Sequence, residues 1–267
     1  MTDPQTTGPL RVERHDDGVV LLTLDLPDRR NAMTGELTSA WAEAVEGLRG
    51  DRDVRCVVVT GAGKAFCAGG DVGWLAAEPD ATVDQLRDRM LPFYRTWLSL
   101  RALDVPSIAA VNGAAVGAGG SLALSTDIRY AGRSARFTVP FAQLGMHAGM
   151  ATTWLLPEVV GVAAARELLL TGRVCDADEM LRLGLVSAVY DDAELLDRAL
   201  EHARQVAAGA PVAQRLHKVA LADGGHACFE DALRWEALAQ PVTLATADLQ
   251  EGLRARAEKR PAVFTGR

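Results

Sequence analysis

Two hydrophobic patterns alternate along the first 150 residues of the chain. Continuous apolar runs rich in β-branched residues predict buried strands at 19–24, 54–60, 106–113 and 127–132. Apolar side chains at helical spacing predict one helix that begins after Thr34, its expected N-cap, and another over 83–101. Strands that alternate with helices in this way favour a parallel sheet that is covered on both faces.

From about residue 149 onward the pattern is mostly helical. Helices are expected at 150–156, 162–171, 177–183, 193–208, 211–223 and 229–256, and a strand at 186–190 interrupts them. The N-terminal residues are polar and lack the apolar stretch of a signal peptide. We therefore expect residues 1–9 to form a disordered tail.

Composition narrows the classes of function. Hydrophobic residues make up 49% of the chain and charged residues 24%, which is ordinary for a soluble globular protein. A net charge of −7, with arginine and lysine scattered along the chain, disfavours a nucleic-acid partner. The four cysteines form no C-x-x-C pair, so we expect no metal site, reduced thiols and a cytoplasmic protein.

Residues 111–127, VNGAAVGAGGSLALSTD, are rich in glycine and alanine. The 22 uncharged residues between Asp104 and Asp127 are long enough to cross a bilayer, but Asn112 interrupts them and a buried strand–turn–helix explains the same composition. A dinucleotide-binding G-x-G-x-x-G is excluded because position 122 is leucine. The upstream GAGKAF is no P-loop, because alanine follows its lysine.

A steric and electrostatic role of the backbone explains residues 111–127 better than a membrane span or a phosphate-binding loop does. A strand that enters a helix through small residues exposes backbone N–H groups that lack acceptors at the helix N-terminus. Such groups can stabilise an oxygen that becomes negative during a reaction. The stretch KAFCAGGD offers the same design after the second strand, so the two turns together could supply two donors. The alternative is that both turns are only tight crossings of packed elements.

Several segments resemble the enoyl-CoA hydratase/isomerase (crotonase) superfamily. The resemblance rests on RRNAM, GAGKAFCAGGD, VPSIAAVNGAAVGAGGSLALSTDIRYAG, TGRVCDADEMLRLGLVSAV and EGLRARAEKRPAVFTGR, which follow the family's order and cover nearly the whole chain. It implies an α/β fold, the crotonase (ClpP-like) spiral of ββα units, over residues 10–200. It also implies a C-terminal helical region over 201–267 that mediates homotrimers, which often pair into hexamers.

The resemblance further implies a coenzyme A thioester as substrate or ligand, with no separate cofactor and no metal. The thioester carbonyl would lie between the backbone N–H groups of Ala68 and Ala118. The other residues expected to bind the substrate are Arg30, Ala32, Lys64, Ala65, Phe66, Gly69, Gly70, Asp71, Gly117, Phe141 and, from a neighbouring subunit, Lys259. Arg256 stands where the family often has an aromatic residue.

Hydratases of this family use two glutamates as general acid and base, and the resemblance places them at Ser121 and Phe141. An aspartate that some isomerases use would fall at Gly149. None of the three is a carboxylate, and a positioned acid or base typically contributes about 10²–10⁴-fold to the rate. Slow hydration of the substrate is therefore expected, although the two backbone N–H groups would still bind the thioester carbonyl.

His147 is the main candidate to replace the carboxylates, because histidine exchanges protons near neutral pH. The alternative for His147 is a hydrogen-bonded structural role, and Ser121 either contacts substrate or fills a helix turn. Cys67 is expected to be a small buried side chain rather than a reactive thiol. Asp71 either caps the following segment or contacts the ligand.

Three functions are compatible with these residues. The first is an enoyl-CoA hydratase/isomerase-type enzyme of fatty acid metabolism that stabilises a thioester enolate with atypical acid–base residues. The second is a non-catalytic acyl-CoA carrier or sensor. The third is a thioester or β-diketone hydrolase on the same fold, which would use Ser121 and His147 as nucleophile and base.

Overall fold

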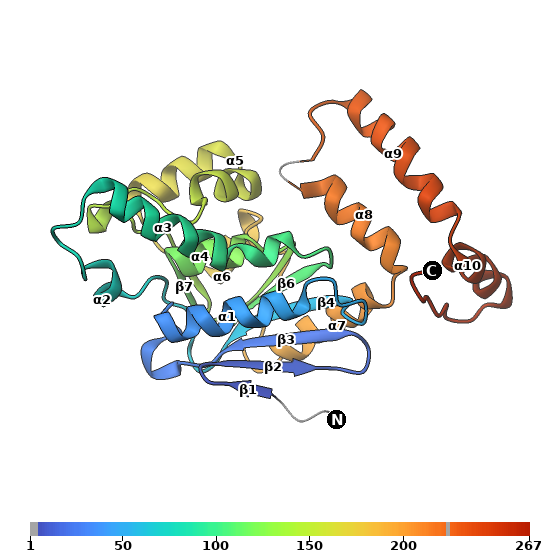
Figure 1. Cartoon of the computed structure of the whole chain (residues 1–267), viewed down its shortest axis with the longest axis horizontal. Coiled ribbons are helices and arrows are strands. Elements are labelled where there is room, and N and C mark those ends of the chain that lie inside the picture. The colour runs from blue at the N-terminus through green and yellow to red at the C-terminus, as the bar shows by residue number, and fades with distance from the viewer. Residues whose placement is uncertain (1–4, 223–224) are drawn as a thin grey trace.

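The computed structural model describes residues 5–222 and 225–267, which fold around two sheets (Figure 1). The larger sheet has the strand order β1-β2-β3-β4-β6-β8-β11. Strands β3, β4, β6, β8 and β11 run parallel, whereas β1 and β2 extend the sheet in antiparallel fashion. The strands are β1 (Gln5–Thr7), β2 (Leu10–Arg14), β3 (Val19–Leu24), β4 (Cys56–Gly61), β6 (Ser107–Val111), β8 (Ile128–Gly132) and β11 (Ala188–Tyr190).

The smaller sheet has the order β10-β9-β7-β5 and carries the turns that the sequence singled out. Its strands β5, β7 and β9 are parallel, and β10 joins them antiparallel. They are β5 (Ala65–Cys67), β7 (Ala114–Val116), β9 (Arg136–Thr138) and β10 (Cys175–Asp176). The hydrophobic pattern did not predict these strands, because two or three residues are too few to show a period.

Helices cover both faces of the larger sheet, as the alternating pattern predicts. The α-helices of the described residues are α1 (Gly35–Leu48), α2 (Val72–Leu75), α3 (Val83–Trp97), α4 (Ala118–Leu124), α5 (Thr152–Thr171), α6 (Ala177–Arg182), α7 (Leu195–Ala207), α8 (Pro211–Leu221), α9 (Phe229–Leu244) and α10 (Ala247–Glu258). Helices α1 and α3 share one core with alternate strand residues such as Val57, and α7 shares a second core with the intervening residues such as Val58.

Local signals explain where the first helices begin. The Thr34 hydroxyl accepts a hydrogen bond from the Leu37 amide at 3.2 Å, so Thr34 is the predicted N-cap of α1. Thr82 and Gln85 form a reciprocal capping box at the start of α3. Trp41 of α1 stacks on Trp97 of α3 with ring centroids 5.1 Å apart, and both rings are fully buried. This contact fixes α3 above the sheet.

Two details of the predicted elements differ, and a third lies outside the described residues. The helix expected over 229–256 is two helices, because Thr246 caps α10 by accepting a hydrogen bond from the Leu249 amide. The expected disorder of residues 1–9 does not hold for Gln5–Thr7, which pair with β2, while residues 1–4 lie outside the described residues. The expected end of a helix at Asp223 also lies outside them.

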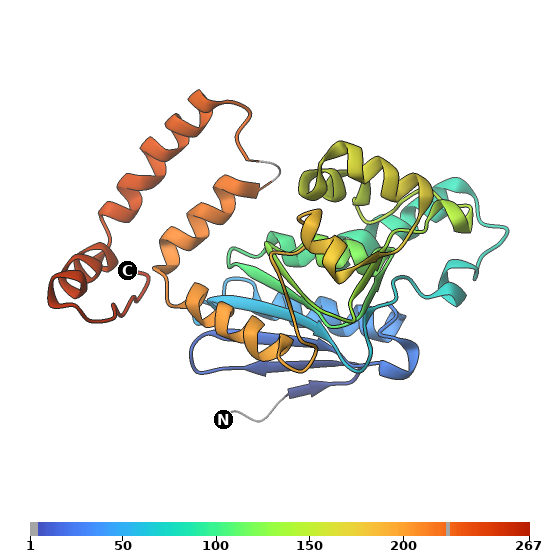
Figure 2. The same ribbon diagram turned by 180° about the vertical axis from the view of Figure 1, so that it is seen from behind.

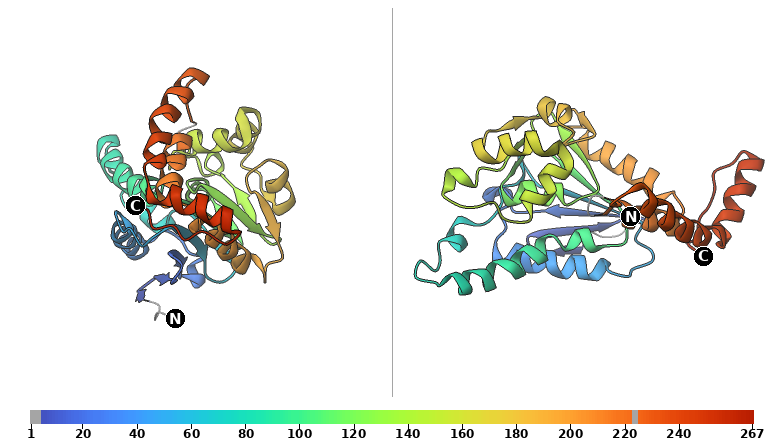
Figure 3. Two further views of the ribbon diagram at one scale, coloured as in Figure 1. Left: turned by 90° about the vertical axis from the view of Figure 1, so that its right-hand side faces the viewer. Right: turned by 90° about the horizontal axis from the view of Figure 1, so that it is seen from above.

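Helices α8, α9 and α10 form an arm that projects from the two sheets (Figures 1 and 2). The view from above shows the same separation of this arm from the body (Figure 3, right). Within residues 5–222 and 225–267, no helix combines the length and apolar character that crossing a bilayer requires.

Candidate active site

A cavity of about 150 Å³ lies at the ends of β5 and β7 and against α3. We call it the apolar pocket. Among the described residues that line it there is no aspartate, glutamate, lysine or arginine. The lining residues are Ala68, Gly69, Gly70, Met90, Phe93, Tyr94, Val116, Gly117, Ala118, Pro140, Phe141, Leu144, Met146, His147, Gly149 and Met150.

The two glycine-rich turns pack backbone against backbone at one side of this pocket. A Cβ added to Gly69 would lie 2.5 Å from the carbonyl oxygen of Val116, and one added to Gly119 would lie 2.1 Å from that of Cys67. Gly69 also has a φ of +89°, which side-chain-bearing residues rarely adopt. The turns therefore need glycine so that two main chains can approach this closely.

The second turn has a backbone amide without an acceptor among the described residues. Ala118 is the first residue of α4, and Gly117 precedes it with a φ of +53°. The first intrahelical bond runs from the Ser121 amide to the Gly117 carbonyl at 3.0 Å. Among the described residues, no acceptor bonds to the Ala118 amide, which lines the pocket at the positive end of the helix.

The first turn requires a correction. The Ala68 amide donates to the Arg30 carbonyl at 2.9 Å, so it is already used within the chain and is not the expected free donor. Two residues on, the Gly70 amide lines the same pocket, and no described residue accepts a hydrogen bond from it. Gly70 was expected only to bind the substrate, and its amide is the available donor of this turn.

The loop expected to contact coenzyme A is held in an unusual conformation. Arg30 and Asn31 both have positive φ, +51° and +55°. The buried Asn31 amide group donates to the carbonyls of Ala65 at 2.8 Å and Ala62 at 2.9 Å, while its oxygen accepts from the Leu26 amide. Asn31 thus ties this loop to the segment that contains Lys64. Ala32 is half-buried, whereas the side chains of Arg30 and Lys64 are exposed.

The remaining residues of the first turn have structural contacts. Ala65 and Phe66 are buried, so only their main chain is accessible to a ligand. Burial raises the pKa of the Cys67 thiol to about 12, and this thiol donates to the Asn31 carbonyl. Asp71 accepts from the Trp74 amide at 2.9 Å and pairs with Arg29, which agrees with the local capping role.

The structure separates the two expected acid–base candidates. His147 is exposed, lines the pocket and places Nδ1 2.7 Å from the Ala148 carbonyl, a contact that favours the proton on Nδ1 and leaves Nε2 as an acceptor. Ser121 is fully buried, does not line the pocket, and contacts the Thr152 hydroxyl at 2.6 Å. No hydrogen bond joins Ser121 to His147 in the part of the chain that is described, so the proposed nucleophile pair is not formed.

Of the remaining residues expected to bind the substrate, Phe141 lines the pocket and Lys259 does not. Phe141 lines the pocket with only 9% of its surface exposed, and its ring lies against Gly117. Lys259 ends α10 in the projecting arm and does not line the pocket of its own chain. Met90, Phe93 and Tyr94 of α3 also line the pocket. Sequence reasoning missed these three, because their helical spacing is equally typical of ordinary core residues.

The family model described as enoyl-CoA hydratase/isomerase matches residues 14–267. The chain belongs to the enoyl-CoA hydratase/isomerase family. Over 253 residues it is 36% identical to the 1,2-epoxyphenylacetyl-CoA isomerase of Escherichia coli, which covers 94% of this chain and 97% of that protein. Over 183 residues it is 46% identical to a probable enoyl-CoA hydratase of Mycobacterium tuberculosis, EchA14. This alignment covers 68% of this chain and 69% of EchA14.

The fold agrees with this membership. The crystal structure of an enoyl-CoA hydratase from Bacillus anthracis superimposes with a TM-score of 0.91 at 32% identity, covering 97% of this chain and all of that one. The predicted α/β crotonase fold is therefore confirmed.

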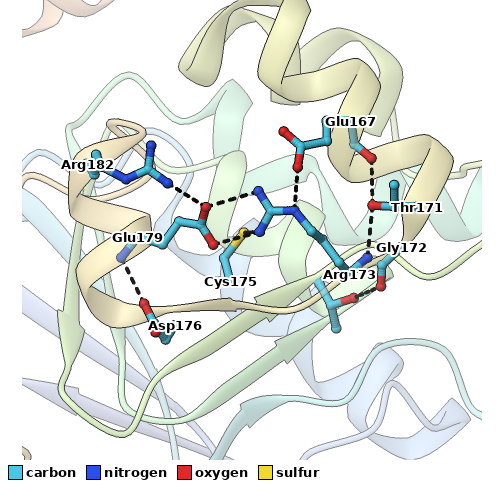
Figure 4. Close-up of polar contacts among 9 residues, drawn as sticks. Glu167, Thr171, Gly172, Arg173, Cys175, Asp176, Glu179 and Arg182 are labelled. Atoms are coloured by element: carbon cyan, nitrogen blue, oxygen red, sulfur yellow. Dashed lines mark hydrogen bonds and ion pairs between the residues drawn. The ribbon is translucent and has the colours of Figure 1, made fainter.

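In this enoyl-CoA hydratase/isomerase family member, an ion-pair network joins α5, β10 and α6 (Figure 4). Arg173 makes a bidentate pair with Glu179, at 2.6 and 3.0 Å, and a third bond to Glu167 at 2.7 Å. Arg182 also bonds Glu179, and these hydrogen bonds hold the pKa of the Glu179 carboxyl below its usual range, with Arg173 the largest cause.

The network connects to the site through the smaller sheet. It links the end of α5 to β10 and α6, and β10 pairs with β9. Within β9, the Thr138 hydroxyl donates to the Gly172 carbonyl at 2.9 Å, and the Thr138 carbonyl accepts from the Gly117 amide at 2.8 Å. This path of contacts fixes the turn that presents the Ala118 amide.

Proposed function

We propose that the protein acts on an acyl-CoA thioester whose carbonyl oxygen accepts hydrogen bonds from the amides of Gly70 and Ala118. The observation that carries the proposal is the pair of amides without acceptors that face one apolar pocket. Main-chain donors aimed at one oxygen stabilise the negative charge of an enolate, and removing one such donor typically costs about 10²–10³-fold in rate.

The proposed reaction is proton transfer next to the thioester, of the isomerase type, rather than addition of water. An attacking water needs a base, and the described pocket lining holds no carboxylate. Phe141 and Gly149 stand at two of the positions where the family resemblance places one. His147 is the proposed acid–base residue, since its Nε2 is left as an acceptor. The reaction requires no cofactor beyond the coenzyme A of its own substrate.

The pocket favours a small apolar acyl group. Aromatic rings of Phe93, Tyr94 and Phe141 line it together with three methionines, whose flexible thioethers adapt to irregular ligands. Two relatives are named for acyl groups that contain a ring, the 1,2-epoxyphenylacetyl-CoA isomerase and, at 35% identity, the (E)-benzylidenesuccinyl-CoA hydratase of Thauera aromatica. A flat ring of this kind suits the proposed pocket.

The coenzyme A portion would follow the loop Arg30–Ala32 and the exposed Lys64 toward solvent. We also propose that the chain forms a homotrimer or a dimer of trimers through the α8–α10 arm, which exposes large apolar side chains such as Phe229 and Leu238, 78% and 72% exposed. Lys259 would then reach the coenzyme A of a neighbouring subunit. A cytoplasmic location remains a prediction from the cysteine pattern.

Proton exchange tests the proposal. The chain is mixed with butyryl-CoA in D₂O, and proton NMR follows loss of the signal at the carbon next to the thioester. We expect exchange in the wild type and a decrease of about 10²–10⁴-fold in His147→Gln, with His15→Gln as the matched control outside the pocket.

Each alternative function predicts a different result. Binding without any exchange would favour the acyl-CoA carrier, and release of free coenzyme A thiol would favour the hydrolase. Rapid formation of a 3-hydroxyacyl-CoA from crotonyl-CoA would contradict the preference for proton transfer over hydration. Absence of acyl-CoA binding would refute the proposal as a whole.

A further inference from the structure

A tyrosine hydroxyl projects into the apolar pocket from α3. Tyr94 is half-buried and lines the pocket with Phe93 and Met90. A Cβ added to Gly149 would lie 2.5 Å from the Tyr94 Oη and 2.9 Å from Cζ. The Tyr94 phenol therefore occupies the space that any side chain at position 149 would enter.

This hydroxyl is a donor that the chain does not use. Among residues 5–222 and 225–267, no hydrogen-bond partner of the Tyr94 hydroxyl is found, although the Tyr94 main chain accepts from the Leu98 amide. Burial raises the pKa of the phenol, so the group is a neutral O–H near neutral pH. The hydroxyl is not among the buried unpaired polar atoms, so solvent reaches it, and an oxygen of the ligand would take the place of water as its acceptor.

We propose that Tyr94 donates a hydrogen bond to an oxygen atom of the acyl group itself, so that the protein prefers acyl-CoA thioesters with a hydroxyl, oxo or epoxide oxygen near the thioester. This inference rests on the proposed function and adds a substrate class to it. The pocket offers Phe141 and three methionines around the remaining carbons, and these supply only apolar contact. Tyr94 thus selects acyl groups that carry an oxygen atom near the thioester, while the apolar lining selects acyl groups by their shape.

Gly149 is needed for this position of the Tyr94 hydroxyl. With any larger residue there, the phenol must move, because the Tyr94 Oη would lie far inside contact distance of the new Cβ. A proton donor at this place does not require a side chain from the loop 145–151. At position 149 itself the loop has no side chain, which leaves room for the phenol.

Matched ligands that differ by one oxygen test the proposal. Dissociation constants are measured by titration calorimetry for butyryl-CoA, both enantiomers of 3-hydroxybutyryl-CoA, and 4-hydroxybutyryl-CoA. We expect the wild type to bind at least one hydroxylated ligand about tenfold more tightly than butyryl-CoA, since one additional hydrogen bond in a partly buried site is worth up to roughly this factor. Tyr94→Phe should bring the affinity for that hydroxylated ligand to within twofold of its affinity for butyryl-CoA.

Two further variants separate this role from a structural one. Tyr130→Phe, at a buried tyrosine of the larger sheet outside the pocket, should keep the tenfold difference. Gly149→Ala should remove it, and the double variant with Tyr94→Phe should show no additional loss, because both changes act on one hydroxyl.

The outcomes distinguish the two proposals. If no acyl-CoA binds, the proposed function fails. If all ligands bind and Tyr94→Phe changes their affinities equally or not at all, the oxygen preference is wrong while the acyl-CoA site stands.

Discussion

The backbone nitrogen of Ala118 lies 3.3 Å from the place that a Cβ would take on Gly69. The two turns are in van der Waals contact through their main chains. Gly69→Ala should therefore push the turns apart and place a side chain in a left-handed conformation, which alone costs about 1–2 kcal/mol. We expect a lower melting temperature and at least a tenfold loss of acyl-CoA affinity, measured by differential scanning fluorimetry and calorimetry.

Gly35→Ala is the control for this change, because a Cβ at Gly35 would meet no atom within 4 Å. It should leave both stability and binding close to the wild-type values. Unchanged affinity in Gly69→Ala would mean that the contact between the turns does not shape the ligand site.

The proposed donor at Ala118 can be removed by proline. Ala118 is the first residue of α4, a position where proline is well tolerated because its N–H takes no part in the helix. Ala118→Pro should retain the fold but reduce the rate of α-proton exchange by about 10²–10³-fold. Gly35→Pro makes the same change at the start of α1, and should leave the rate unaltered. Equal rates in Ala118→Pro and the wild type would show that this amide does not act on the carbonyl.

The Glu179 network should contribute to stability in a pH-dependent way. Because its pKa is lowered in the folded chain, its contribution is present above the ordinary glutamate value of 4.5 and is lost as the pH falls below it. At pH 7, Glu179→Gln should melt about 2–4 °C below the wild type, the usual effect of losing about 1 kcal/mol. The difference in melting temperature between the two proteins should narrow as the pH decreases through 4.5.

Thermal melts between about pH 7 and pH 3.5 measure the gap. Glu43→Gln, at an exposed position of α1 outside the network, provides the comparison. A gap that stays constant over this range would exclude an ionic origin.

Three of the four cysteines should resist alkylation in the folded protein. Burial raises the pKa of Cys56 and Cys67 to about 12 and that of Cys175 to about 11, so their thiolates are scarce at pH 8. Cys228 is exposed. Intact-mass spectrometry with iodoacetamide should show at most one adduct under native conditions and four after unfolding. A second native adduct would contradict the burial of these thiols.

The exposed apolar side chains of the arm predict association. Leu238→Glu places a charge on α9, where the leucine is 72% exposed. If this surface is an interface, light scattering after size exclusion should report three or six chains for the wild type and fewer for the variant. Val83→Glu, 80% exposed at the start of α3, should keep the wild-type mass. A monomeric wild type would refute the proposed trimer.

The sequence predicted the long elements well and the site only in part. Residues 19–24 are a strand with the predicted bounds, because a continuous β-branched run has few alternatives. The error at Ala68 has a different cause. Whether an amide is free depends on a carbonyl from a distant loop, that of Arg30, which no local pattern reveals. Tyr94 was missed for a similar reason, since its position depends on the missing side chain at Gly149, a residue distant in sequence whose place the phenol takes.

The pair of amides at Gly70 and Ala118 has an evolutionary consequence. Main-chain donors cannot be deleted by exchanging one side chain for another, as long as the backbone path is kept. Under the proposed function, a relative that has lost its catalytic carboxylates would therefore still keep both donors to the thioester carbonyl. A new reaction could then evolve in a site that still binds acyl-CoA thioesters, and not on a surface without such affinity.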